Sequence, residues 1–135
     1  MENNLTLDII SPVETLFSGE VNSVTIPGTL GSFQVLKNHA PLISSFEIGK
    51  IKIKNDAGIL EYSTSGGIFE VKNNEAIILA ESVESKEEID LKRANESKAR
   101  AEEILKMMEA KVEEKEEARL ALQRAINRIK IAQKN

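Results

Sequence analysis

The stretch "ESVESKEEIDLKRANESKAR", residues 81–100, joins two parts of the chain whose hydrophobic patterns differ. Before it, apolar and polar residues alternate as they do in β-strands, and after it apolar residues recur at the spacing of an amphipathic helix. We therefore predict two segregated parts: an N-terminal all-β sandwich domain over residues 1–84 and a C-terminal α-helical hairpin over residues 85–135. The fold class is α+β overall.

The first part contains short runs rich in β-branched residues, which are separated by residues that favour turns. The runs are LTLDII, EVNSVTI, GSFQVL, KIKIK, ILEYSTS, GIFEVK and EAIILAE, and the breaks lie at residues 27–28, 55–58, 66–67 and 73–74. Seven or more strands in about 80 residues can bury their apolar faces only in a sandwich or barrel. We expect an ordinary turn at "PGTLGS" and a tight turn or close strand approach at Gly66-Gly67, not ligand sites.

The second part contains two apolar seams with helical spacing. The first comprises Leu91, Ala94, Ala101, Leu105, Met108 and Val112, and the second comprises Ala118, Leu122, Ala125, Ile129 and Ala132. Alanines in both seams favour close packing of two helices. The connection, residues 109–118, contains neither Gly nor Pro, so local propensity allows both a hairpin and one continuous rod.

Charge is distributed unevenly along a chain whose net charge is −4. Residues 1–84 hold 11 acidic and 5 basic side chains, whereas residues 85–135 hold 11 acidic and 13 basic ones, including every arginine. A basic end suggests an acidic protein surface or phosphates as a partner. Nucleic acid is not expected, because all aromatic residues precede residue 70 and leave the basic segment nothing to stack on bases.

Composition excludes several classes of protein. The absence of cysteine rules out disulfides and thiolate metal sites, and the longest apolar run, residues 76–80, is too short to insert into a membrane. The first residues do not resemble a signal peptide, so we expect a soluble chain that faces the cytosol. The single histidine, His39, lacks the surroundings of a catalytic group, and we predict no catalytic or metal-ligating residues.

Asp90 has two interpretations. Asp is a favoured helix N-cap, and the Ser85 to Glu88 spacing fits a capping box just before it. Alternatively, helical spacing places five charged residues along one edge of an antiparallel helix pair that turns near residue 113. These are Asp90, Arg93, Arg100, Arg124 and Arg128, with Arg100 between the last two, whereas Arg119 lies on the other flank. Guanidinium groups so close repel one another unless an anion binds among them, which suggests a nucleotide.

Three stretches, "SPVETLFSGEVNSVTIPGTLGSFQVLKNHAPLIS", "GGIFEVKNNEAIILAESVE" and "IDLKRA", resemble the epsilon subunit of the bacterial F-type ATP synthase. The resemblance extends over essentially the whole chain in order, spacing and layout. It implies a non-catalytic central-stalk subunit of a rotary proton-translocating enzyme, peripheral on the cytoplasmic face of the bacterial plasma membrane. The implied partners are the gamma subunit, the c-ring and the alpha/beta catalytic hexamer, and the two-helix domain is similar to one that either folds down or extends to restrain ATP hydrolysis.

The same resemblance implies an ATP site. Ile89, Asp90, Arg93 and Ala94 match the family's I/L-D-x-x-R-A motif, which holds ATP in some members. Arg100, Arg124 and Arg128 fall where helper arginines are expected, and Glu84 is placed near the base. ATP would be a regulatory ligand, with no cofactor required.

The resemblance also implies that a docking segment, His39, Ala40, Pro41 and Leu42, meets the partner subunits. Gln34 departs from the family's pattern, which has glycine there, and this affects the local turn. A stand-alone ATP-sensing module remains the alternative function.

Overall fold

The computed structural model describes residues 4–134. Within that range the chain forms eight β-strands, a short 3₁₀ helix and two α-helices. They are β1 (Leu5–Ile10), β2 (Thr15–Val21), β3 (Ser23–Gly28), β4 (Gly31–Leu36), β5 (Leu42–Asn55), β6 (Gly58–Lys72), β7 (Glu75–Ala80), β8 (Val83–Ser85), η1 (Lys86–Glu88), α1 (Leu91–Lys106) and α2 (Val112–Gln133). The strands come first and the helices last, as the change of hydrophobic period predicts.

The strands form one hydrogen-bonded sheet that folds over into two layers. Its order is β2-β1-β7-β6-β5-β3-β4, with β8 paired to β6, and β1 and β7 run parallel. Residues 42–47 of β5 pair with residues 66–71 of β6 in the layer that contains β7. Residues 49–55 pair with residues 58–64 in the layer that contains β3 and β8. The predicted sandwich is confirmed, and β5 and β6 belong to both of its layers.

The hydrophobic core lies between these layers. Leu5, Leu7 and Ile9 alternate along β1 and are fully buried, and they belong to the same core as the fully buried Ile51 and Ile53 of the other layer. Alternate residues of a strand point to the same face, so the period of two seen in the sequence becomes one buried face per layer.

Turn chemistry explains two of the predicted breaks between strands. Asn73 and Asn74, both at positive φ, connect β6 to β7, and "PGTLGS" forms the tight β3–β4 turn that was expected. The break at residues 66–67, in contrast, lies inside β6, so the runs ILEYSTS and GIFEVK are one strand, not two. Gly66 has a φ of 117°, and a Cβ on Gly67 would lie 2.1 Å from the carbonyl oxygen of Leu79. The predicted close approach of two strands is therefore observed between β6 and β7, but it lies within one bent strand, β6.

Two further runs also differ from the prediction. EVNSVTI contains the end of β2 and the start of β3, and KIKIK is only the second half of β5. Periodicity alone reveals neither the change of strand within the first run nor the bend that precedes the second.

The helices form a hairpin, not a continuous rod. Ala94 and Ala101 of α1 and Ala118 and Ala125 of α2 are buried, which confirms the centre of both seams. The turn spans residues 107–111, earlier than the predicted residue 113. Met108 and Val112, expected in the first seam, are 94% and 73% exposed at this turn.

The early start of α2 has a local cause. The backbone N–H of Lys111 donates to the side chain of Glu114 (3.0 Å), and Glu113 and Glu114 place negative charge in the first turn of the helix. Acidic residues there interact favourably with the unpaired N–H groups and the helix dipole. These contacts fix the N-terminus of α2 at Val112.

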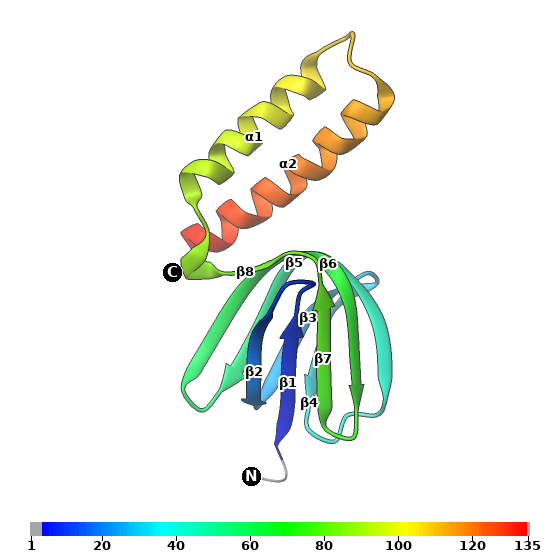
Figure 1. Cartoon of the computed structure of the whole chain (residues 1–135), viewed down its shortest axis with the longest axis vertical. Helices are drawn as coiled ribbons and strands as arrows, with labels where there is room; N and C mark the ends of the chain where they lie inside the picture. Colours follow the sequence, from blue (N-terminus) through cyan, green and yellow to red (C-terminus); the bar gives the residue numbers. More distant parts are fainter. Residues whose placement is uncertain (1–3, 135) are drawn as a thin grey trace.

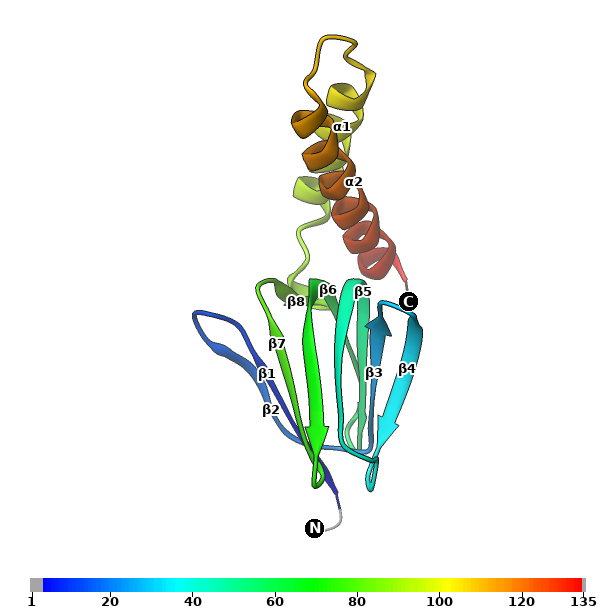
Figure 2. The same ribbon diagram turned by 90° about the vertical axis from the view of Figure 1, so that its right-hand side faces the viewer.

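The hairpin stands on one end of the sandwich, and α2 makes the contact (Figure 1). The side chain of Asn127 donates to the carbonyl oxygen of Gly49 (2.8 Å) and to the hydroxyl of Ser63 (3.3 Å), close to where β5 and β6 bend. Ile131, which lies outside the predicted seam, is 3% exposed. Strand β1 begins at the other end of the sandwich (Figure 2).

Candidate functional site

Four arginines line one cavity between the helices and the sandwich. We call it the arginine pocket; its volume is about 430 Å³. Its lining residues are Ser82, Glu84, Arg93, Ser97, Arg100, Ala121, Arg124, Ala125 and Arg128. Glu84 comes from β8, whereas the arginines come from both helices. The structure thus brings together five of the eight residues predicted to bind ATP.

Helical spacing explains this gathering. Arg93, Ser97 and Arg100 follow one another at intervals of four and three along α1, and Arg124 and Arg128 are four apart on α2. Residues at such intervals share one face of a helix. Arg119 lies on a different face of α2, where it pairs with Glu116 (2.8 Å), as its predicted place on the other flank requires.

The register of the helices differs from the prediction. Because the turn is at residues 107–111, Arg93 lies level with about residue 125 of the antiparallel partner, beside Arg124 and Arg128. Arg100 lies nearer the tip of the hairpin and also borders a second cleft there. Arg100 was predicted to lie beside α2 between Arg124 and Arg128. In the structure Arg93 lies there instead.

The pocket is strongly positive but has one internal carboxylate. Arg128 Nε donates to Glu84 Oε1 (2.6 Å), and Arg128 Nη2 lies 3.5 Å from Glu84 Oε2. Within residues 4–134, Arg93, Arg100 and Arg124 form no ion pair. The nearest polar partner of Arg100 is the hydroxyl of Ser97, which accepts from Nη2 (3.3 Å). Three guanidinium groups therefore keep donors available for an anion.

The other three predicted ATP-binding residues do not line the pocket. The Asp90 side chain accepts a hydrogen bond from the backbone N–H of Arg93 (3.0 Å) and caps α1. Ala94 is fully buried, and Ile89 lies just before the cap. The Ser85 N–H donates to Glu88 (3.2 Å), as in the predicted capping box. The structural interpretation of Asp90 is thus observed, and a role in binding ATP stays a prediction.

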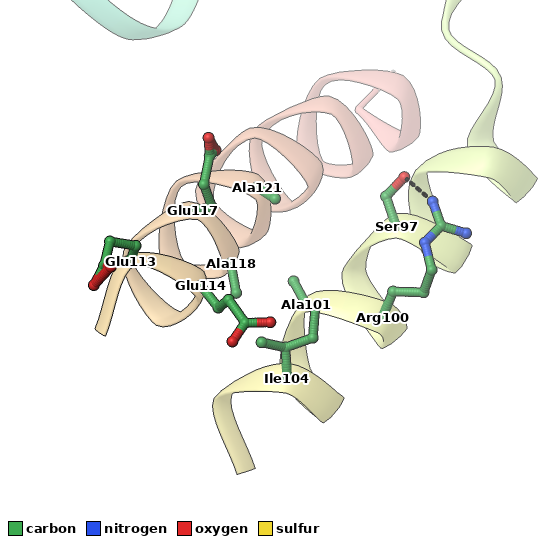
Figure 3. A pocket seen from close by; sticks show the side chains of 9 residues that line it. All are labelled: Ser97, Arg100, Ala101, Ile104, Glu113, Glu114, Glu117, Ala118 and Ala121. Carbon is green, nitrogen blue, oxygen red and sulfur yellow. Dashed lines mark hydrogen bonds between the residues drawn. The ribbon is translucent and has the colours of Figure 1, made fainter. Parts of the chain in front are cut away.

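The second cleft, which we call the tip cleft, has a volume of about 510 Å³ and a different character (Figure 3). Ala101, Ile104, Ala118 and Ala121 line it together with Glu113, Glu114 and Glu117. The Arg100 side chain is directed to Ser97 (Figure 3). Since acidic groups repel phosphates, the tip cleft does not suit an anionic ligand.

Comparison with known proteins is decisive for the family. The family model for the ATP synthase Delta/Epsilon chain beta-sandwich domain matches residues 4–86, and the model for the long alpha-helix domain matches residues 87–133. The ATP synthase epsilon chain of Desulfitobacterium hafniense is 41% identical over 132 residues, which cover 98% of each chain. That of Desulforamulus reducens is 35% identical over 133 residues, 98% of this chain and 100% of the relative.

The chain belongs to the ATP synthase epsilon-chain family. Epsilon chains are non-catalytic subunits, in agreement with the prediction that the chain is not an enzyme. As a member of that family, it is a subunit of a membrane-bound complex. None of the helices within residues 4–134 is long and apolar enough to span a membrane.

Solved structures share the fold of this epsilon chain at low identity. A chain of the Euglena gracilis mitochondrial ATP synthase, in a structure of OSCP, F1 and the c-ring, aligns with a TM-score of 0.80 and 19% identity over 90% of this chain and 76% of its own length. A chain from the central stalk and c-ring of the Tetrahymena thermophila mitochondrial enzyme aligns with a TM-score of 0.64 and 14% identity over 96% of both chains. At these identities the likeness supports the fold alone.

The predicted docking segment of this epsilon chain lies far from the arginine pocket. His39, Ala40 and Pro41 follow β4 in the loop to β5, and the preceding Asn38 is hydrogen-bonded to Asn74 in the β6–β7 turn. Both connections lie at the end of the sandwich opposite the hairpin (Figure 2). The Leu42 side chain packs against the core, so only part of it is accessible. Whether the segment contacts a partner subunit stays a prediction.

Sequence reasoning missed an ion pair within the sandwich of this epsilon chain. Lys50 of β5 pairs with Glu61 of β6 (3.0 Å), and the Glu61 side chain is only 15% exposed. The hydrogen bond to Glu61 raises the pKa of Lys50. Burial raises the pKa of Glu61, but the hydrogen bond and charge of Lys50, together with the charges of Lys134 and Lys86, outweigh it, and the pKa lies below its ordinary value. The alternating lysines in "KIKIK" indicated a strand with one charged face, but they did not reveal which strand supplies the partner carboxylate.

Residues 4–134 contain no group of three His, Cys, Asp or Glu side chains that could hold a metal ion. A ligand of the arginine pocket would be bound by guanidinium groups and hydroxyls.

Proposed function

We propose that this epsilon chain is a central-stalk subunit that regulates ATP hydrolysis by binding ATP in the arginine pocket. The observation that carries the ATP assignment is the convergence of Arg93, Arg100, Arg124 and Arg128 on one cavity of about 430 Å³. Phosphate oxygens accept charge-assisted hydrogen bonds from guanidinium groups, often two at a time. A triphosphate would therefore offset the mutual repulsion of these side chains.

The remaining motif residues are assigned supporting roles. Asp90 caps α1 and so orients the first turn that carries Arg93, while Ala94 lets α2 approach closely. We assign Asp90, Ile89 and Glu84 to the ribose and base side of the nucleotide, because the arginines account for the phosphate side. ATP acts here as a regulatory ligand.

The pocket exists only when the helices are antiparallel. One continuous helix over residues 91–133 would place Arg93 and Arg128 about 50 Å apart at 1.5 Å per residue. A ligand shifts a two-state equilibrium by its preference for one state, so ATP would stabilise the folded hairpin against extension toward the alpha/beta hexamer. The inhibitory state would then be favoured when ATP is scarce.

The sandwich serves for docking. We assign residues 1–84 as a docking domain for the gamma subunit and the c-ring, and residues 85–135 as the regulatory domain, on the cytoplasmic face of the bacterial plasma membrane. Chains of the same fold occur in an assembly of OSCP, F1 and the c-ring and in one of the central stalk and c-ring, which supports docking of the sandwich at the c-ring. The docking surface includes His39, Ala40, Pro41 and the exposed part of Leu42.

Calorimetric titration of the full chain with ATP tests the site. Arg124→Ala should weaken binding about ten- to a hundredfold, because a hydrogen bond to a charged group contributes roughly 1.5–3 kcal/mol. Arg119→Ala is the matched control, with the same change of charge on the same helix but outside the pocket. Equal losses in both variants, or no binding by the parent chain, would contradict the proposed ATP site.

A further inference from the structure

We infer that Glu84 regulates the arginine pocket by competing with an anionic ligand for Arg128. The inference rests on the proposed function, because it assumes that phosphates bind in this pocket. It gives Glu84 a second role beside the proposed contact with the base: until a nucleotide binds, the carboxylate occupies donors that a phosphate chain would use.

The geometry of the ion pair supports competition. Arg128 presents one side of its guanidinium group to the carboxylate, with Nε to Oε1 at 2.6 Å and Nη2 to Oε2 at 3.5 Å. This side-on arrangement matches the fork with which arginine binds one phosphate group. The two side chains are 24% and 31% exposed, so the pair is partly shielded from water but open to exchange with a ligand.

The position of the competing carboxylate is fixed by the sandwich. Glu84 lies on β8 and pairs through its backbone with Ser63 of β6. Ser63 also accepts a hydrogen bond from Asn127, the residue next to Arg128 on α2. The strand that holds Glu84 and the helix that holds Arg128 are thus joined at neighbouring residues, which keeps the carboxylate within reach of the guanidinium group while its side chain stays free to rotate away.

Two consequences follow from such an arrangement. A phosphate chain must displace Glu84 from Arg128, so the carboxylate lowers the affinity of the pocket for any polyphosphate. At the same time the ion pair ties α2 to the sandwich, so the folded hairpin has a stabilising contact that does not depend on ATP. Glu84 would therefore raise the ATP concentration that is needed to shift the equilibrium toward the folded hairpin.

Inorganic tripolyphosphate separates this role from a contact with the base, since it has neither base nor ribose. Calorimetric titrations of the full chain would compare the parent, Glu84→Gln, and Glu75→Gln as a control. Gln keeps the shape of the side chain and removes its charge, and Glu75 is an exposed glutamate at the start of β7, so the change of net charge is the same. We expect Glu84→Gln to bind tripolyphosphate about fivefold more tightly, as loss of one partly exposed ion pair implies.

A second measurement follows the hairpin without any ligand. Amide hydrogen exchange in residues 120–133 of α2 should be faster in Glu84→Gln than in the parent, because one tie to the sandwich is lost. A residue that only contacted the base would leave both tripolyphosphate affinity and exchange unchanged.

The outcomes distinguish the inference from the proposed function. Tighter tripolyphosphate binding by Glu84→Gln, with no change in Glu75→Gln, supports competition. Equal or weaker binding by Glu84→Gln overturns it. If the parent binds neither ATP nor tripolyphosphate, the proposed ATP site itself fails. If the parent binds both and Glu84→Gln leaves the tripolyphosphate affinity unchanged, only the competing role of Glu84 is wrong.

Discussion

Replacing Asn127 by alanine should loosen the hairpin from the sandwich. The side chain donates two hydrogen bonds, to the Gly49 carbonyl (2.8 Å) and to the Ser63 hydroxyl (3.3 Å). Each bond contributes about 1 kcal/mol net, and the second is long, so their loss together costs up to about 2 kcal/mol. Alanine has a higher helix propensity than asparagine by roughly 0.5 kcal/mol, but this acts on α2 in both the docked and the detached hairpin and does not change the docking equilibrium. The docking equilibrium should shift by about tenfold toward the detached state.

The absence of cysteine makes this shift easy to measure. Two unique labels can be introduced by Lys37→Cys at the far end of the sandwich and Glu109→Cys at the turn of the hairpin, both exposed positions. Energy transfer between them reports how far the hairpin stands from the sandwich, and its temperature dependence gives the docking equilibrium.

Gln123→Ala is the control, because Gln123 is exposed on α2 and forms no side-chain hydrogen bond within residues 4–134. The same energy-transfer change in Gln123→Ala and Asn127→Ala would refute the reasoning, and so would an unchanged docking equilibrium in Asn127→Ala.

Two more outcomes are expected. The Glu61 pKa lies below its ordinary value of 4.5, so the carboxylate stabilises the fold above that value and ceases to do so as the pH falls through the folded-state pKa. Urea unfolding at neutral pH and at about pH 3 measures how much unfolding free energy is lost in acid. This loss should be smaller in Glu61→Gln than in the parent, and an equal loss would contradict the role of the Lys50 pair. For docking, Ile43→Asp should leave thermal unfolding nearly unchanged yet prevent assembly with the gamma subunit, because Ile43 is 70% exposed beside the docking segment. Leu42→Asp should also lower thermal stability, since Leu42 packs against the core; normal assembly of Ile43→Asp would count against this surface.

Local patterns predicted what local forces determine. The runs at residues 5–10 and 31–36 became strands with the expected ends, and Ala94, Ala101, Ala118 and Ala125 face the partner helix as their spacing indicates. The gathering of the arginines also followed from helical spacing, although their role in binding ATP stays a prediction.

Contacts between distant segments were not predictable in the same way. Nothing in the periodicity of β6 shows that the chain continues as one strand through Gly66, because glycine permits both a turn and a bend. The tie from Asn127 to Gly49, the burial of Ile131 and the pairing of Glu61 with Lys50 all depend on where two elements meet, which single-sequence patterns do not encode. The early hairpin turn followed from a side chain to backbone hydrogen bond at Glu114 that propensity does not reveal.

Because β5 and β6 belong to both layers, the two layers of the sandwich cannot unfold independently. Neither layer can unravel without breaking the long strands that also build the other, so the sandwich should melt in a single cooperative transition. The hairpin, attached to the sandwich mainly through α2, should unfold as a separate and less stable unit. The slowest-exchanging amides should lie in β5 and β6, and folding should wait on pairing these strands, whose partners are distant in the chain.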